Sequence, residues 1–236
     1  MGREVCAVVS AADDMELVGG FGRSHAGEDL ATLAGLSRPA GRMFDDAAHL
    51  YDAASPNVVV DFTVYPTTVD VAREAVVRGI SPVIGATGWT DEDEVSFESM
   101  CDEYGIGAAI VPNFALGAVL MMRFAAEAAR FYPTSEIVEL HHDRKVDAPS
   151  GTARATARRM ATAAAGRDVP IHSVRLRGLV AHQEVLFGGE GETLTIRHDS
   201  LARSSFMAGV LLAVRGVRAR RNLVVGLDSF MEFSAS

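Results

Sequence analysis

The chain has 236 residues, of which 48% are hydrophobic and 22% are charged, so it can bury a sizeable core in one large domain or two modest ones. Its 22 basic and 31 acidic residues give a formal net charge of −9, which argues against a general nucleic-acid or membrane partner. No apolar run can span a bilayer and no signal peptide pattern begins the chain, so we expect a cytoplasmic protein. The two cysteines, Cys6 and Cys101, form no metal or redox motif and are expected to be reduced thiols.

Strand-like apolar runs alternate with helical patterns through the first half of the chain. The expected strands cover residues 15–21, 58–63, 82–85 and 108–111. Apolar residues at helical spacing predict a helix over 67–79, and four acidic residues from Asp91 onward are typical of a helix start. Alternation of this kind favours a parallel sheet with crossover helices, as in doubly wound nucleotide-binding domains.

The second half has a different pattern, in which helices are followed by a group of extended runs. Alternating side chains from Glu192 to His198 predict a half-buried antiparallel strand. We therefore predict an α/β domain over residues 1–113 and 204–236, interrupted by an α+β domain over 114–203. The expected helices cover 117–131, 152–164 and 204–218, and the expected strands cover 136–141, 172–177, 180–187, 192–198 and 223–227.

Groups that can move protons or bind anions are concentrated between Glu136 and Ala153. His141 and His142 end an apolar alternating run, and Lys145 follows three residues later. A histidine titrates near neutrality, and a lysine ammonium can bind a carboxylate or give a proton. This arrangement indicates a loop between a strand and a helix, which is where catalytic groups are commonly carried.

The same span contains a helix start that suits an anion. Ser150 is a good N-cap, and the backbone N–H groups of the first helical turn would be open to a carboxylate or phosphate near Gly151 and Thr152. We therefore predict a small substrate with at least one carboxylate, which is protonated during the reaction. Structural histidines at a strand end and a solvated basic face remain alternatives. A His-His-Asp metal site is a further one, but because no third ligand has a recognisable spacing we expect no metal.

The segment Glu139-x-His141-His142-x-x-Lys145-x-Asp147-Ala148-Pro149-Ser150-Gly151-Thr152-Ala153 resembles the signature of the 4-hydroxy-tetrahydrodipicolinate reductase family, which serves the diaminopimelate and lysine pathway. The resemblance extends in order over essentially the whole chain. It is supported by the segments 60–63, 83–90, 111–117, 178–185, 194–200 and 203–206.

This resemblance implies a reaction and assigns roles to the segment. The family reduces a cyclic dicarboxylate imine, with loss of water, by means of a nicotinamide hydride from NADPH or NADH. His141 would be the proton donor and acceptor, and Lys145 a second proton donor. His142 would contact the substrate, while Gly151 and Thr152 would hold one of its carboxylates.

The resemblance also implies how the two domains divide the work. The first domain would be Rossmann-like and bind the dinucleotide, and the inserted domain would bind the substrate. A homotetramer would assemble through the sheet of the inserted domain. Ala86 stands where a threonine is common in the family. The nicotinamide side of the cofactor would be lined by Gly85, Ala86 and Thr87 and by Val111, Pro112, Asn113 and Phe114.

Two departures from the family concern the cofactor. Met1 to Glu4 match only the end of a glycine-rich turn and the first helical residues, so the first strand and two glycines that place the pyrophosphate are missing. After the strand at 15–21, Gly22 replaces the usual acidic residue that takes the ribose hydroxyls. The next residue, Arg23, could pair with a 2′-phosphate, which favours NADPH, or be a solvated turn residue.

The missing strand would lie centrally in the sheet and bury four or five apolar side chains, each worth roughly 1.5–3 kcal/mol. We therefore expect Met1 to be an internal methionine of a longer natural chain. One alternative function is a truncated, cofactor-deficient homologue that binds a dicarboxylate or a partner without catalysis. Another is a reductase of similar architecture that acts on a different small acid.

Overall fold

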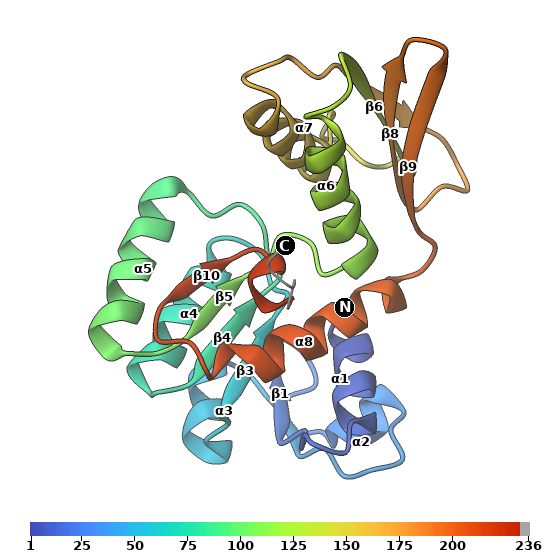
Figure 1. The fold of residues 1–236 in the computed structure, drawn as a ribbon. Helices are drawn as coiled ribbons and strands as arrows, with labels where there is room; N and C mark the ends of the chain where they lie inside the picture. The colour runs from blue at the N-terminus through green and yellow to red at the C-terminus, as the bar shows by residue number, and fades with distance from the viewer. Residues whose placement is uncertain (232–236) are drawn as a thin grey trace. The chain divides into compact units, whose positions relative to one another are not determined.

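The computed structural model describes residues 1–231, and these form two compact units (Figure 1). Within the described residues, the first unit contains Met1–Phe114 and 206–231, and the second contains Ala115–Ser205. None of the helices in the described part of the chain is long and apolar enough to cross a membrane. Cys6 and Cys101 are free thiols, and burial raises the pKa of Cys101 to about 12.

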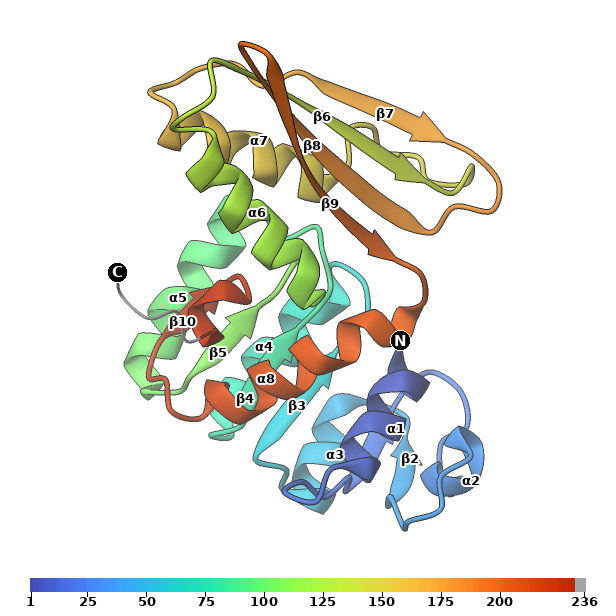
Figure 2. The ribbon, with the colours of Figure 1, turned by 45° about the vertical axis from the view of Figure 1, so that its right-hand side comes forward.

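The main sheet of the first unit is parallel, as the alternating pattern predicted. Its order is β10 (Leu223–Val225), β5 (Ala108–Ile110), β4 (Ser81–Ile84) and β3 (Val58–Asp61). All four residues of β4 are buried, because this strand has a neighbour on each side and helices on its faces. The strands therefore end together at one edge of the sheet (Figure 2).

Helices cover both faces of this sheet. The helices α4 (Thr67–Val77) and α5 (Asp91–Tyr104) enclose a core with β4 and β5 that includes the fully buried Phe97. The helix α8 (Met207–Val217) packs against β4 and β5 and also against α1 (Gly2–Ala11) (Figure 2). The side chain of Thr90 accepts a hydrogen bond from Asp93 N, which explains why α5 begins at the acidic run.

A short parallel pair, β1 (Gly19–Phe21) and β2 (Arg42–Phe44), forms a separate two-stranded sheet. The prediction of a strand over 15–21 was wrong for its first half, because β2 offers hydrogen bonds to only three residues of β1. A cavity of about 780 Å³ lies between β1 and β3, and Val5 and Val9 of α1 also line it. In residues 1–231 no strand occupies this position, which is where a doubly wound sheet has its first strand.

Other boundaries differ from the sequence-based expectations by a few residues. The helix expected over 204–218 is a 3₁₀ turn, Arg203–Phe206, followed by α8. The elements that were not predicted include α2 (Leu30–Ala34), β2 and α3 (Ala47–Ala54). The side chains of Asp29 and Asp46 cap the two helices, so their start signals were present but had no long apolar run behind them.

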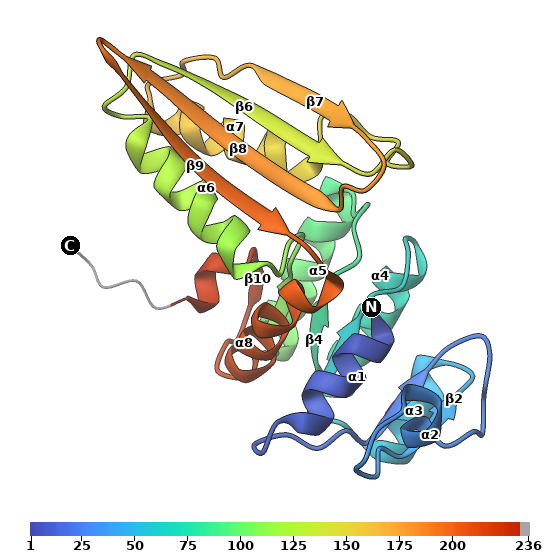
Figure 3. The same ribbon diagram turned by 90° about the vertical axis from the view of Figure 1, so that its right-hand side faces the viewer.

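The second unit is a mixed sheet with two helices on one face (Figure 3). The sheet order is β7 (Ile171–Arg175), β6 (Thr134–His141), β8 (Ala181–Gly189) and β9 (Glu192–Ser200). The predicted antiparallel pairing at 192–198 is confirmed, since β9 pairs antiparallel with β8, and only β7 runs parallel to β6. The helices are α6 (Leu116–Ala128) and α7 (Gly151–Ala163).

Candidate functional site

The candidate site begins where strand β6 ends. The strand alternates strictly, so that Ser135, Ile137 and Glu139 are buried. Glu139 is fully buried, although alternation alone would place an apolar residue there. His141 follows two residues later, so its side chain lies on the same face of the sheet as Glu139.

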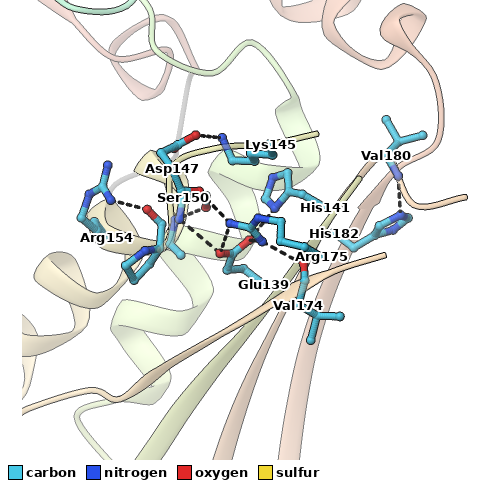
Figure 4. A network of polar contacts seen from close by, with 12 residues as sticks. Glu139, His141, Lys145, Asp147, Ser150, Arg154, Val174, Arg175, Val180 and His182 are labelled. Carbon is cyan, nitrogen blue, oxygen red and sulfur yellow. Dashed lines mark hydrogen bonds and ion pairs between the residues drawn. The ribbon is translucent and has the colours of Figure 1, made fainter. Parts of the chain in front are cut away.

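Glu139 is the centre of the polar network in Figure 4. Arg175 donates two hydrogen bonds to it, from Nη1 to Oε2 at 2.9 Å and from Nη2 to Oε1 at 2.8 Å. Oε2 also bonds His141 Nδ1, and Oε1 accepts from the backbone N–H of Ser150 at 3.3 Å. Burial raises the pKa of this carboxyl, but the bonds from Arg175, Ser173 and His141 outweigh burial and leave the pKa below its ordinary value.

His141 has one ring nitrogen engaged and the other available. Its Nδ1 bonds Glu139 and its side chain is 14% exposed, so Nε2 is the atom that a ligand can reach. Burial lowers the pKa of this imidazole, Glu139 raises it, and the positive charges of Lys145 and Arg175 lower it further. The net direction is downward, so the free protein holds His141 largely neutral at pH 7.

Lys145 lies near His141 in the turn that follows β6 (Figure 4). Its Nζ donates to Asp147 Oδ1 at 2.7 Å, which lowers the pKa of the Asp147 carboxyl. The backbone N–H of Lys145 donates to the His142 carbonyl at 3.1 Å, and Arg175 Nη2 donates to the Asp147 carbonyl at 2.8 Å. The turn therefore has a defined shape that keeps the ammonium beside the imidazole.

The helix α7 begins where the sequence predicted an anion site. Ser150 is its N-cap and accepts a hydrogen bond from Ala153 N at 3.1 Å. Gly151 is exposed, and a Cβ at this position would meet no atom within 4 Å. A side chain at this position would therefore meet open space within residues 1–231. The N–H groups and the dipole of the first turn favour a negative charge.

His142, which was predicted to contact the substrate, is half-buried just after β6. Its Nδ1 is buried and has no hydrogen-bond partner in the structure. A buried ring nitrogen without a partner is costly unless something outside the chain satisfies it. His142 is thus brought to the same turn as Lys145, with unused hydrogen-bonding capacity.

Two neighbouring strand ends carry the residues predicted to face the nicotinamide. Gly85, Ala86 and Thr87 follow β4, and Val111 to Phe114 follow β5. The Phe62 ring, just after β3, lies over Gly85 and is 5.4 Å from the Phe114 ring between centroids. The predicted residues therefore gather at one edge of the main sheet. Ala86, Val111 and Phe114 are buried there, Thr87 and Pro112 are exposed, and Gly85 and Asn113 are intermediate.

Two further positions lie elsewhere in the first unit. Arg23 is exposed in the loop that follows β1, as either a partner of a 2′-phosphate or a solvated turn residue would be. Within residues 1–231, a group of potential metal ligands consists of the exposed Asp45, Asp46 and His49. Their contacts explain the grouping without an ion, because Asp46 caps α3 and Asp45 bonds the His49 ring at 2.7 Å.

Arg175 and Glu139 were not predicted to belong to the site. A charged residue on the inward face of an alternating strand is a signal that could have identified Glu139. Arg175 carries no such local signal, because it reaches the site only through the pairing of β7 with β6.

Comparisons with known proteins cover nearly the whole chain. The family model for "Dihydrodipicolinate reductase, N-terminus" matches residues 1–114, and that for "Dihydrodipicolinate reductase, C-terminus" matches residues 117–231. The 4-hydroxy-tetrahydrodipicolinate reductase of Moorella thermoacetica is 44% identical, over 99% of this chain and 94% of the relative. That of Geobacillus thermodenitrificans is 45% identical, over 98% of this chain and 95% of the relative.

Solved structures agree with this result. A dipicolinate-bound dihydrodipicolinate reductase from Paenisporosarcina sp. TG-14 has a TM-score of 0.84 and 37% identity, covering 98% of this chain and 95% of its own. An amine dehydrogenase from Mycobacterium smegmatis, at 14% identity and a TM-score of 0.69, shares the fold. On the family models and on the identity with full-length relatives, the chain belongs to the dihydrodipicolinate reductase family.

Proposed function

We propose that this chain reduces 4-hydroxy-tetrahydrodipicolinate to tetrahydrodipicolinate with a nicotinamide cofactor, in lysine and diaminopimelate biosynthesis. One observation carries the proposal beyond family membership. The buried carboxylate of Glu139 joins the imidazole of His141 to the N-cap of α7, and Lys145 stands beside them. A proton donor, an ammonium and an anion-binding helix start thus belong to one connected structure.

His141 and Lys145 are the proposed proton donors. The free imidazole has a lowered pKa, but a bound dicarboxylate would bring negative charge close to Nε2 and raise that pKa again. His141 would then be protonated in the complex and able to give its proton to the atom that gains negative charge. Lys145 would bind a substrate carboxylate or supply the second proton, and this requires the substrate to compete with Asp147 for its ammonium.

The proposed carboxylate site is the first turn of α7, with His142 beside it. The backbone N–H groups of Gly151 and Thr152 would bind one carboxylate, with the Thr152 hydroxyl as a further donor. The unpartnered Nδ1 of His142 would bond the substrate, which would remove the cost of leaving it unsatisfied. The Paenisporosarcina protein was solved with dipicolinate, which is itself a dicarboxylate.

The residues at the edge of the main sheet fit a nicotinamide cofactor. In open α/β sheets the cofactor lies beyond the carboxyl ends of the strands, and the ends of β3, β4 and β5 meet there. Trp89 follows the predicted Gly85–Thr87 segment, and its Nε1 is buried without a partner. When bound, the cofactor would supply the hydride. The chain would supply the surface that orients it, with Arg23 as the proposed partner of the 2′-phosphate of NADPH.

The same proposal assigns one ligand to each unit and an oligomeric state to the chain. The first unit would bind the dinucleotide and the second the dicarboxylate. A homotetramer in the cytoplasm would form through the sheet of the second unit. The face of that sheet opposite α6 and α7 includes the exposed Val174.

The test uses the purified 236-residue chain, and the enzyme of the preceding step in the pathway generates its substrate. Substrate-dependent oxidation of NADPH or NADH, followed by absorbance, is the expected result. Binding is measured separately for each partner. Quenching of Trp89, the sole tryptophan, reports the dinucleotide, and calorimetry reports dipicolinate.

Dipicolinate binding without dinucleotide binding would overturn the proposal in favour of the cofactor-deficient homologue. Binding of both without turnover would also contradict it and would direct attention to another small acid. Turnover that requires NADPH rather than NADH would support the role of Arg23. Arg23→Ala should then weaken the use of NADPH, and Arg38→Ala is the control for a general loss of positive charge.

A further inference from the structure

We propose that Glu139 and Arg175 are positioning residues, whose buried ion pair fixes His141 as the Nδ1–H tautomer and ties the Lys145 turn and the start of α7 to the same point. This inference rests on the proposed function of His141 and Lys145 as proton donors. The experiment below therefore includes a measurement that does not depend on turnover.

The register of the sheet explains why these side chains meet. Strand β7 runs parallel to β6 and places Ser173 opposite Glu139 and Arg175 opposite His141. Opposite residues of neighbouring strands point to the same face. Arg175 therefore extends along the inward face past His141, and its guanidinium meets the carboxylate of Glu139 with two bonds of 2.9 and 2.8 Å.

The hydrogen bonds of Glu139 determine the tautomer of His141. An ionised carboxylate has about four acceptor positions and no donor. Arg175 donates to both oxygens, Ser150 N and the Ser173 side chain also bond the carboxylate, and His141 Nδ1 bonds Oε2. Since the carboxylate can only accept, Nδ1 must carry the hydrogen. When the ring is protonated, the proton that it can give is therefore on Nε2, for which residues 1–231 supply no hydrogen-bond partner.

Arg175 extends the same control to Lys145. Its Nη2 donates to the Asp147 carbonyl at 2.8 Å, and the Asp147 side chain accepts from Lys145 Nζ at 2.7 Å. A lysine at position 175 could not match these bonds, because a single ammonium lacks the planar fork that serves two carboxylate oxygens and a carbonyl together.

A role limited to holding the fold would be better served by other residues. Removing two charges from water is costly, and apolar side chains of similar size commonly stabilise a fold equally well. The ion pair also balances the charge at the imidazole, since Glu139 raises the pKa of His141 whereas Arg175 and Lys145 lower it. These three charged groups face the imidazole from its own strand, from the turn that follows it and from β7.

The decisive experiment is nuclear magnetic resonance of the complete chain with nitrogen-15 in its histidines. His141 is expected to be the Nδ1–H tautomer when neutral. His172 is an internal control of opposite sense, because it bonds Glu136 through Nε2 at 2.8 Å and should be the Nε2–H tautomer. An Nε2–H tautomer at His141 in the unmodified chain would overturn the proposal, whatever the variants do.

Variants then separate positioning from support of the fold. Glu139→Gln is expected to lose the uniform tautomer and to lower the pKa of His141, whereas Arg175→Gln should raise that pKa. Both should lower kcat by about tenfold to a hundredfold or more, with a smaller change in the Kd of dipicolinate. Arg175→Lys should recover only part of the activity.

Matched controls are available on β6 and just beyond β7. Glu136→Gln removes an exposed carboxylate of β6 that bonds His172 of β7. Arg177→Gln removes an exposed arginine just beyond β7. Both controls should leave kcat and the His141 signals unchanged. Two results would contradict the proposal, namely pKa shifts of the same sign in Glu139→Gln and Arg175→Gln, or an unchanged tautomer in Glu139→Gln.

A failure of the proposed function would look different. If the unmodified chain shows no turnover but His141 has the Nδ1–H tautomer and responds with opposite signs to the two variants, the positioning role stands and the reaction is wrong. If a variant does not fold, the tautomers of His141 and His172 in the unmodified chain still decide the question.

Discussion

The ammonium of Lys145 donates to Asp147 Oδ1 at 2.7 Å, and this contact is local to one turn. Asp147 is half exposed, whereas the Lys145 side chain is only 22% exposed. A partly exposed ion pair of this kind contributes roughly 0–1 kcal/mol to stability. The pair therefore serves to orient the ammonium more than to stabilise the fold.

Replacing Lys145 should consequently affect the reaction much more than the fold. Lys145→Ala is expected to lower kcat/KM by about 10²–10⁴-fold, through lost carboxylate binding and lost proton donation. The melting temperature should change little, because the effect on unfolding should stay within about 0.5 kcal/mol. Steady-state kinetics and calorimetry measure the two effects, with Lys145→Arg as the variant that keeps the charge. Wild-type kinetics in Lys145→Ala would remove this residue from the site.

His141→Gln is expected to separate catalysis from binding. The imidazole is proposed to give its proton only as the substrate gains negative charge, so kcat should fall by about 10²–10⁴-fold. The Kd of dipicolinate, measured by calorimetry, should change by only a small factor. His172→Gln is the control, since that ring is exposed on the strand next to β6. Unchanged turnover in His141→Gln would refute the acid role.

The pH dependence should differ between the free protein and its complex. Burial holds the pKa of free His141 below its ordinary value, so kcat/KM should fall as pH rises through a value below about 6.5. The proposed dicarboxylate would raise that pKa, so kcat should fall only at higher pH. Profiles of kcat and kcat/KM between about pH 5 and 9, a range that includes the ordinary pKa of histidine, test this order. Coincident limbs would show that the substrate does not act on the pKa of His141.

The parts of this structure that were predictable are those fixed by local pattern. The helix α4 has apolar residues at helical spacing, and the strands β3 and β4 are short apolar runs. The strand expected from Met15 was shortened because its partner β2 is short and its other edge faces the cavity. Pairing in space, which a local apolar pattern does not contain, decided its length.

The candidate site divides in the same way. His141, Lys145 and Ser150 lie within ten residues of one another, so their grouping was visible in the sequence. Arg175 is separated from His141 by a helix and a strand connection, and only the register of β7 against β6 brings the two together. Residue types alone could not show that Glu139 would be ionised and fully buried, because that depends on this distant arginine.

Gly151→Ala tests the proposed carboxylate site with little disturbance of the fold. The backbone at Gly151 does not have a positive φ, and an added Cβ would meet nothing within 4 Å. The free energy of unfolding should therefore change by less than about 0.5 kcal/mol, or rise slightly because alanine favours the helix. The methyl group would project where the carboxylate is proposed to bind, so the Kd of dipicolinate should rise by about tenfold. Gly2→Ala, also free of contacts at a helix start, is the control. An unchanged Kd would place the carboxylate elsewhere.

Gly85→Ala tests the packing of the main-sheet edge that is proposed to face the nicotinamide. An added Cβ would lie 2.1 Å from the Phe62 ring, so the ring would have to move away from β4. Overpacking of this kind costs roughly 1–3 kcal/mol, and the displaced ring would also disturb its contact with Phe114. Phe62→Leu should make room for the methyl group, so the double variant should be more stable than the sum of the two single effects by about 0.5 kcal/mol or more. Chemical denaturation of the four proteins measures this coupling. Strict additivity would mean that Phe62 does not require a glycine at position 85, and the edge would then be open to larger residues.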